Sequence, residues 1–277
     1  MSKAVLYDAN RCIGCRGCQA ACKQWNENDE IIPEPPYTWD KTVNWGCSEN
    51  PPQLSARTWT KIRFTELDYN GKFHWVFTKL QCMHCEHPGC VQACIVGALE
   101  KTEAGPVTYD DRKCIGCRYC QLACPFGIPN FEWDKPLPWI RKCTFCADRQ
   151  GGGLKPACVT TCPTGALKFG ERDELITEAR GRITDQPDKY VDYIYGEKEA
   201  GGTSWMYLSP VPFEKLDFQT LGPESVTLDV ERAMAAVPPA LVLVAASMAG
   251  FYWLTQRRQR MSQTKDGDEE KEGAVKK

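Results

Sequence analysis

The spacing of the cysteines constrains this chain more than any other feature of its sequence. Sixteen of its seventeen cysteines fall into four groups of four. The groups are Cys12, Cys15, Cys18 and Cys22; Cys82, Cys85, Cys90 and Cys94; Cys114, Cys117, Cys120 and Cys124; and Cys143, Cys146, Cys158 and Cys162. A C-x2-C-x2-C run places three thiolates along one loop, where they can bind three irons of a cubane, and the fourth ligand comes from elsewhere in the chain. The pattern predicts four [4Fe–4S] clusters, each a carrier of single electrons.

Two other uses of these cysteines fit the sequence less well. A disulfide framework is typical of short secreted chains, whereas this chain has 277 residues and a 42% hydrophobic composition, enough for a core. A zinc ion fits the fourth group taken alone, because two separated cysteine pairs form a tetrahedral thiolate site, but it fits the triplets poorly. Cys47 lies outside every group, and we interpret it as a bystander thiol rather than a ligand or redox centre.

The cysteine groups repeat along the chain. Residues 12–22 and 114–124 agree at nine of eleven positions. Residues 90–99 and 158–167 likewise share Cys-Val at their start, a second cysteine, and Gly-Ala-Leu at their end. We therefore expect a duplicated bacterial-type two-cluster ferredoxin, in which each loop-held triplet is followed by a short helix and a strand. The predicted fold class is α+β.

Composition and motifs indicate a chain that transforms no substrate itself. Acidic residues (36) and basic residues (34) nearly balance, and the net charge of −2 gives no reason to expect nucleic-acid binding. No nucleotide fingerprint or catalytic triad is visible, and Gly151–Gly153 lacks the strand and helix that frame a phosphate loop. We interpret His84 and His87, which lie within the second cysteine group, as neighbours of a cluster rather than ligands.

The C-terminal region predicts one membrane-spanning helix. The 22 residues from Ala233 to Leu254 carry no charge, and at roughly 1.5 Å per residue they reach about 33 Å, which is enough to cross the hydrocarbon core. A buried core helix is the alternative, and Pro238-Pro239 fit the start of a helix. We predict an iron–sulfur domain over 1–232, a transmembrane helix over 233–255 and a charged, disordered tail over 256–277.

Charge around the predicted span favours one orientation. Arg257, Arg258 and Arg260 follow Tyr252 and Trp253, so the positive-inside rule places the C-terminus in the cytoplasm and the iron–sulfur domain on the periplasmic side of the inner membrane. The first eleven residues contain neither a twin-arginine pair nor an apolar region. Export of the folded domain would then depend on a partner that carries the signal, and a cytoplasm-facing domain is the alternative.

Beyond the cysteines, the chain resembles a known family over nearly its whole length. The order of the four groups, with x4 spacing in the second and x11 in the fourth, resembles electron-transfer subunits of molybdopterin oxidoreductases. Other segments are similar to the iron–sulfur (beta) subunit of membrane-bound respiratory formate dehydrogenase. They are Cys12-Ile13-Gly14-Cys15 with Trp25-Asn26, residues 54–60, residues 82–86, Gly201-Gly202-Thr203, Met206-Tyr207 and the C-terminal span. Ile95, where that family has a proline, is a departure that removes no ligand.

This resemblance implies a crossed assignment of ligands. The implied sets are Cys12, Cys15 and Cys18 with Cys162; Cys143, Cys146 and Cys158 with Cys22; Cys82, Cys85 and Cys90 with Cys124; and Cys114, Cys117 and Cys120 with Cys94. The linkers alone would also allow the first two groups to pair with each other.

The resemblance also implies a function within a complex. A catalytic subunit with a molybdenum or tungsten pterin would oxidise formate, this chain would conduct the electrons, and a membrane cytochrome b subunit beside the lipid-embedded helix would pass them to quinone. Equivalent subunits of a hydrogenase or of a polysulfide or sulfoxide reductase are the alternatives, because they use the same cysteine pattern. A binding module held together by structural clusters is a further alternative, but four clusters exceed what a chain of this length needs for stability.

Overall fold

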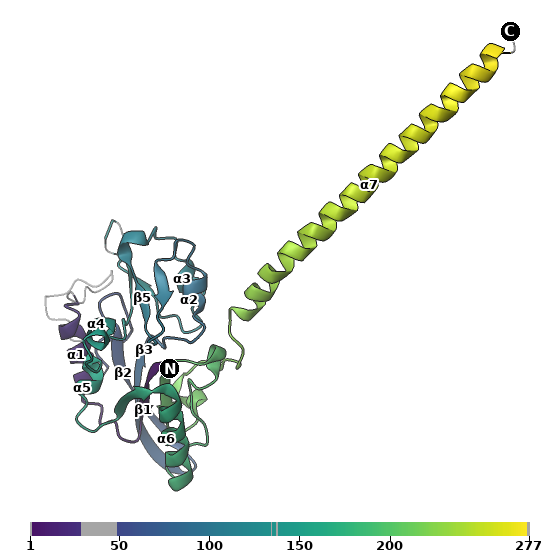
Figure 1. Cartoon of the computed structure of the whole chain (residues 1–277). Helices are drawn as coiled ribbons and strands as arrows, with labels where there is room; N and C mark the ends of the chain where they lie inside the picture. Colours follow the sequence, from purple (N-terminus) through teal and green to yellow (C-terminus); the bar gives the residue numbers. More distant parts are fainter. Residues whose placement is uncertain (1, 29–48, 134, 137, 276–277) are drawn as a thin grey trace. The chain divides into compact units, whose positions relative to one another are not determined.

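A computed structural model of the chain describes residues 2–28, 49–133, 135–136 and 138–275. Cys47 lies outside the described residues, so its interpretation as a bystander stays a prediction. The chain divides into two compact units, Met1–Thr227 and Leu228–Lys277 (Figure 1). The first unit contains all sixteen grouped cysteines, and the second is a single helix.

The first unit is built around a three-stranded sheet. Strand β1 (Lys3–Asp8) lies between β8 (Leu167–Glu171), to which it is antiparallel, and β9 (Trp205–Leu208), to which it is parallel. Alternate residues of β1 and β9 point to opposite faces, as a strand requires. Helix α6 (Arg172–Asp185) covers one face. The residues packed on that face are Ala4, Leu6, Leu175, Ala179, Ile183, Met206 and Leu208.

A long hairpin packs near the other face of this sheet. Strands β2 (Thr60–Tyr69) and β3 (Lys72–Gln81) pair over their full length. Asn70-Gly71 joins them with both residues at positive φ, which is the geometry that a two-residue hairpin turn favours. The Tyr7 hydroxyl donates to the Phe77 carbonyl at 2.7 Å and ties the hairpin to the sheet.

The remaining elements of the first unit are short and carry or flank the cysteines. The helices are α1 (Gly17–Trp25), α2 (Gly89–Gln92), α3 (Tyr119–Leu122), α4 (Ala147–Gly151) and α5 (Ala157–Thr160), and the strand pairs are β4 (Leu99–Lys101) with β5 (Val107–Tyr109) and β6 (Asn130–Phe131) with β7 (Ile140–Arg141). Single 3-10 turns are η1 (Asp111–Lys113), η2 (Glu199–Gly201) and η3 (Phe213–Leu216).

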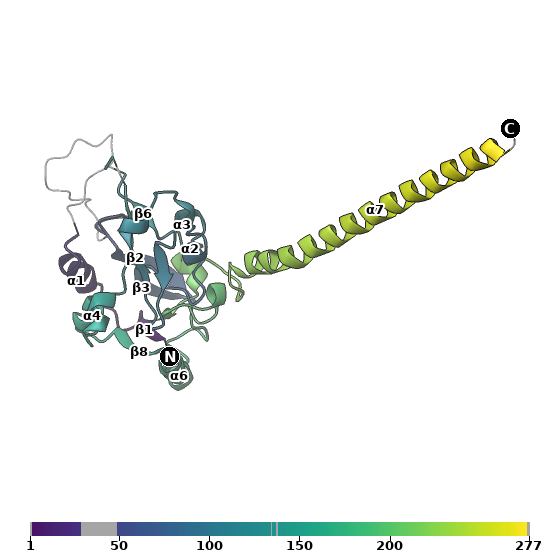
Figure 2. The same cartoon turned by 45° about the horizontal axis from the view of Figure 1, so that its top comes forward.

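Two arrangements of these elements match each other. Helix α1 packs on α5 where β1 pairs with β8. Helix α2 packs on α3, which lies beside it in Figure 2, where β4 pairs with β5. The first arrangement brings the first and fourth cysteine groups together, and the second brings the second and third together. A mixed α/β architecture with two ferredoxin-type units follows, and the alternative pairing of the first group with the second is not seen.

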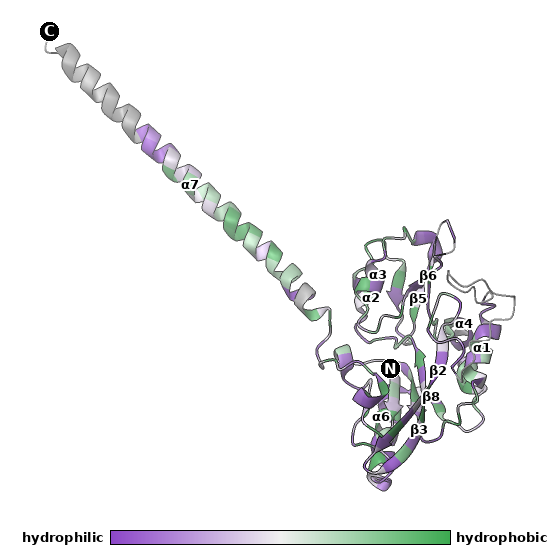
Figure 3. Cartoon of the chain, turned by 180° about the vertical axis from the view of Figure 1, so that it is seen from behind, coloured by the Kyte–Doolittle hydropathy of each residue, from purple (hydrophilic) through white to green (hydrophobic). Residues whose placement is uncertain are grey.

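The second unit is helix α7 (Leu228–Val275). Its segment Glu231–Arg260 has a mean hydropathy of 1.8 in its most apolar window and is not buried, so it is long and apolar enough to cross a membrane. Figure 3 shows apolar residues gathered along the middle of the helix, followed by a polar stretch. Arg257 stacks over the ring of Trp253 at 5.5 Å, so a cation and an aromatic side chain lie together where the apolar segment ends.

The bounds of α7 differ from those that the sequence predicts. The helix begins at Leu228 rather than at Ala233, and Pro238 and Pro239 lie inside it rather than at its start. The stretch 231–237 contains good helix formers, which extend the helix before the prolines. The helix also continues to Val275 through Lys- and Glu-rich residues that favour helix. The disorder predicted for 256–277 and the predicted domain bounds stay predictions.

Candidate iron–sulfur cluster sites

The loops that hold the cysteine triplets depend on glycine. Gly14 and Gly116 take positive φ values of 66° and 71°, a region that glycine enters without steric cost. In this conformation the Gly14 N–H donates to Cys12 Sγ at 3.4 Å, and the Gly116 N–H donates to Cys114 Sγ at 3.4 Å. A Cβ on Gly14 would also lie 3.0 Å from the Phe77 ring. The loop therefore turns its amides toward sulfur, as an anionic cluster requires.

A cavity gathers the first predicted ligand set, which we call site I. Site I consists of Cys12, Cys15, Cys18 and Cys162. Tyr7, Ile62 and Leu167 line the same cavity and make it apolar on its inner side. All four cysteines are free thiols. The cysteine from the fourth group thus faces the triplet of the first group, as the crossed assignment predicts.

A second cavity gathers the next predicted set, which we call site II. Site II consists of Cys22, Cys143, Cys146 and Cys158. Thr60, Lys79 and Trp205 also line it. Phe145, within its loop, has positive φ, and its N–H donates to Cys143 Sγ at 3.4 Å. Cys162 therefore lies with the triplet of the first group and Cys22 with three cysteines of the fourth.

The other two sets are brought together by the packing of α2 on α3. Site III consists of Cys82, Cys85, Cys90 and Cys124, and site IV consists of Cys94, Cys114, Cys117 and Cys120. Burial raises the pKa of Cys85 well above its usual range, and the thiolates of Cys82, Cys124 and Cys90 raise it further. Burial likewise raises the pKa of Cys120 to about 11, with contributions from three other site IV cysteines. Such electrostatic influence requires that the members of each set lie close together.

A single metal ion is the alternative to a cluster at these sites. Among the described residues, no group of three or more His, Cys, Asp or Glu side chains is arranged to bind one. Zinc at site II stays the alternative that the sequence left open.

Burial favours the protonated form of several of the free cysteines. It raises the pKa of Cys18, Cys22 and Cys90 to about 12. Iron binds thiolate rather than thiol, so loading the sites must release protons. The four sites therefore fit a [4Fe–4S] group chemically, because each offers four sulfur donors whose negative charge is favourable only when iron compensates it.

His84 is a buried neighbour of the sites, in agreement with its interpretation from the sequence. Its Nδ1 accepts the Val107 N–H at 2.9 Å, and its ring stacks on Phe145 with centroids 4.9 Å apart. Burial, with help from nearby lysines, holds its pKa well below the usual range, so the ring is neutral. The stack joins the loop of site III to the loop of site II. His87 is exposed.

The sites form a linear series. Cys158 of site II contributes to raising the pKa of Cys18 of site I, and Cys82 of site III contributes to raising that of Cys143 of site II. Cys120 of site IV likewise contributes to raising the pKa of Cys90 of site III. The order I, II, III, IV, which the sequence could not supply, follows from these neighbours.

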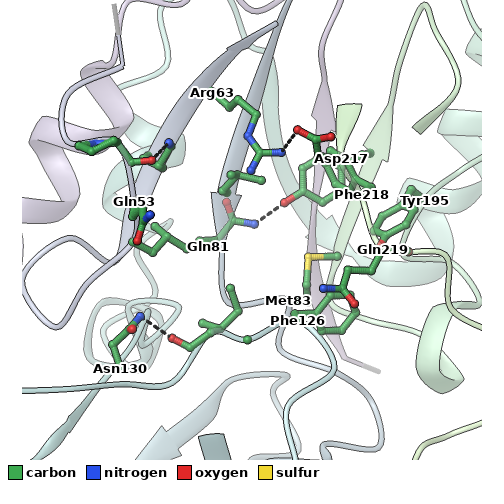
Figure 4. A pocket seen from close by; sticks show the side chains of 17 residues that line it. Gln53, Arg63, Gln81, Met83, Phe126, Asn130, Tyr195, Asp217, Phe218 and Gln219 are labelled. Atoms are coloured by element: carbon green, nitrogen blue, oxygen red, sulfur yellow. Dashed lines mark hydrogen bonds and ion pairs between the residues drawn. The ribbon is translucent and has the colours of Figure 1, made fainter. Parts of the chain in front are cut away.

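A larger cavity lies apart from the cysteines. Its volume is about 380 Å³, and Figure 4 shows Arg63 directed at Asp217 and Gln81 directed at the hydroxyl of Tyr207. No cysteine lines it. Two pairs of its polar side chains, Arg63 with Asp217 and Gln81 with Tyr207, are hydrogen-bonded to each other, and the second pair fixes Gln81.

Sequence reasoning missed two buried lysines. Lys79 is 1% exposed and Lys142 is 5% exposed. Lys142 immediately precedes Cys143, and Lys79 lies three residues before Cys82. The Lys142 Nζ donates to the Val107 carbonyl at 2.5 Å and to the Cys143 carbonyl at 3.2 Å. Lys113 also precedes a cysteine group but is exposed, so sequence position alone could not have identified the buried pair.

These sites define an iron–sulfur protein, and comparison with known proteins supports that class. Two family models described as 4Fe-4S dicluster domains match residues 11–98 and 73–172. A protein of Nitratidesulfovibrio vulgaris is 40% identical over 265 residues, which cover 94% of this chain and 69% of that protein. The hydrogenase-2 operon protein HybA of Escherichia coli O157:H7 is 33% identical over 97% of this chain and 88% of its own length.

A further relative narrows the family. The iron–sulfur subunit of the nitrate-inducible formate dehydrogenase of Escherichia coli K12 is 41% identical over 209 residues, which cover 74% of this chain and 67% of that subunit. The chain belongs to the family of formate dehydrogenase iron–sulfur subunits, as the resemblance in sequence indicated.

Proposed function

We propose that this chain is the electron-transfer subunit of a formate dehydrogenase complex and binds one [4Fe–4S] cluster at each of sites I to IV. The observation that carries the proposal is the pair of cavities lined by the crossed sets of cysteines. A bound cluster would supply reversible one-electron chemistry at each site. The chain's own contribution is to hold four such sites in a series within one protein interior.

We infer the direction of electron transfer from where the chain leaves the first unit. Val226, two residues before α7, packs on α2, since a Cβ on Gly89 would lie 2.9 Å from Val226 Cγ2. Gly89 immediately precedes Cys90 of site III. This supports sites III and IV as the membrane-proximal end of the series, with site I receiving electrons from a molybdopterin catalytic subunit.

The C-terminal helix completes the proposed assignment. Its apolar segment would cross the inner membrane once, in lipid and beside a cytochrome b subunit that reduces quinone. The arginines after Trp253 favour a cytoplasmic C-terminus and a periplasmic iron–sulfur domain. The proposed units are an iron–sulfur domain of two interleaved modules over 1–232, the span over 233–255 and the charged tail.

A hydrogenase subunit is the second candidate function. HybA matches 97% of this chain, whereas the formate dehydrogenase subunit matches 74%. The greater coverage extends into the C-terminal region, but the identity over the matched residues is higher for the formate dehydrogenase subunit, at 41% against 33%.

One experiment separates these functions. The complex is purified anaerobically from membranes, and electron paramagnetic resonance follows cluster reduction after addition of formate or of hydrogen. We expect about sixteen iron and sixteen sulfide per chain and reduction by formate alone. Reduction by hydrogen alone would assign the chain to a hydrogenase, and an iron content near twelve with bound zinc would remove one cluster site. Truncation before Ala233 should abolish quinone reduction while dye reduction by the complex persists.

A further inference from the structure

Lys79 places an ammonium group in the interior of the first unit. The residue lies near the end of β3 and is 1% exposed. Its side chain lines the cavity of site II, and its Nζ lies 4.3 Å from the centroid of the Trp205 ring. Removal of an ammonium from water is costly unless a negative charge or several acceptors compensate it.

The hydrogen bonds of Lys79 hold it in place but do not neutralise it. Nζ donates to Thr60 Oγ1 at 2.7 Å and to Gln81 Oε1 at 2.9 Å, and both acceptors are uncharged. Gln81 is itself fixed because its Nε2 donates to the Tyr207 hydroxyl, which donates in turn to the Lys79 carbonyl at 3.0 Å. The ammonium is therefore held in place beside site II by hydrogen bonds to Thr60 and Gln81, and Gln81 also lines the cavity of Figure 4.

Lys79 lines the cavity of site II, and the cysteines of sites I and II, which must be thiolates to bind iron, would supply the negative charge that compensates it. Burial lowers the pKa of Lys79, but thiolates of sites I and II outweigh burial and raise it. Three of them, Cys158, Cys143 and Cys22, belong to site II, and Cys18 belongs to site I. The ammonium thus interacts electrostatically with cysteines of both sites, and most of these cysteines belong to site II.

We propose that Lys79 is a fixed buried cation that raises the reduction potential of the cluster at site II and, less strongly, that of the cluster at site I. Reduction adds one negative charge to a cluster, so a nearby cation stabilises the reduced form more than the oxidised form. The effect is large where water is excluded, and net charge is one of the determinants of cluster potential. Lys79 would then make site II a favourable acceptor from site I. This inference rests on the proposed cluster sites.

The test is a redox titration of the intact complex, followed by electron paramagnetic resonance. Lys79→Met removes the charge and keeps the length of the side chain, and Lys79→Arg keeps the charge. The matched control is Lys72→Met, which removes the same charge from the exposed start of the same strand. Cysteine-to-serine variants of each site assign the signals.

We expect Lys79→Met to lower the reduction equilibrium constant at site II at least tenfold, which equals 59 mV for a one-electron couple. The shift at site I should be smaller, sites III and IV should not move, and Lys79→Arg should restore most of the potential. An unchanged site II potential, or an equal shift in Lys72→Met, would overturn the proposal.

Loss of protein integrity is distinguished by iron and sulfide analysis of each variant. If Lys79→Met fails to retain its clusters, Lys79→Gln, which keeps a hydrogen-bonding group without the charge, is titrated instead and must show the same lowered potential. If the wild-type protein itself lacks a cluster at site II, the proposed function fails rather than the role of Lys79.

Discussion

The two halves of the first unit share one plan for holding cysteines and differ in what surrounds it. Sites I and II lie against a three-stranded sheet that α6 covers on its far face. Sites III and IV lie against two short strand pairs, β4–β5 and β6–β7, and a small apolar cluster whose buried members include their own Cys90 and Cys120. The cysteine spacing therefore determines the ligand geometry, and the surrounding elements determine how deeply each site is buried.

Exposed apolar side chains lie beside site IV. Ile95, Ile115, Tyr119 and Leu122 are 55–83% exposed, and Ile13, at the matching place beside site I, is 59% exposed. Apolar patches on a protein surface mark places where another molecule binds.

The strongest test of the shared plan is the matched pair Cys22→Ser and Cys94→Ser. Cys22→Ser should eliminate or distort the cluster of site II and leave site I, whose triplet precedes it in sequence, largely intact. Cys94→Ser should do the same to site IV and spare site III. Formate-dependent quinone reduction should fall at least tenfold in both, while the catalytic subunit still reduces a dye. Electron paramagnetic resonance of each variant decides the assignment, and damage to sites I and III instead would show that ligands are not crossed.

Because the two halves differ in what surrounds them, the same Leu→Ala substitution should lower the free energy of unfolding by different amounts in each. Leu175 of α6 is 2% exposed and packs on the central sheet, so Leu175→Ala should destabilise the first unit by about 2–5 kcal/mol. Leu122 of α3 is 83% exposed, so Leu122→Ala should change its stability by less than about 0.5 kcal/mol. Denaturation of the isolated chain measures both. An equal loss would mean that the two halves are buried to the same extent in solution.

A smaller effect tests whether the two halves also differ in the stabilisation that they gain from ion pairs. Burial raises the pKa of Glu132, but hydrogen bonds from Lys135 and Arg141 outweigh burial, and the pKa is lowered. Lys168 and Arg182 do the same for Glu178. A lowered pKa means stabilisation above the ordinary value of 4.5, which is lost as pH falls through the folded value.

Glu132→Gln and Glu178→Gln should therefore each cost roughly 1 kcal/mol near pH 7, and the gap from wild type should close as pH falls below 4.5. Thermal denaturation as a function of pH checks this. Similar losses of stability in the two variants would mean that the halves differ mainly in the apolar residues that surround their sites. A difference in stability from wild type that widens at low pH would contradict the lowered pKa of the two carboxyl groups.

The cysteine sites could be predicted because cluster chemistry leaves few choices of residue and spacing. The duplicated groups predicted the repeated architecture, and similarity to a family supplied the crossing that brings Cys22 to site II. The sequence could not predict that Lys79 is buried, because lysine at a strand end is usually exposed and only the packing of Trp205 and Thr60 removes it from water. Helix α7 begins before Ala233 and contains Pro238 and Pro239, which the sequence had suggested as a helix start, because the residues before them also favour helix; the bounds of the membrane span stay a prediction.

Crossed ligands also impose an order on biosynthesis. A ribosome delivers the chain from its N-terminus, so the sulfurs of sites III and IV are all available once Cys124 has emerged. Site I must wait for Cys162, although its triplet is among the first residues made. The maturation machinery that inserts iron and sulfide can therefore finish the second half while the first is still open, and a nascent chain arrested between Cys124 and Cys143 should already acquire two clusters.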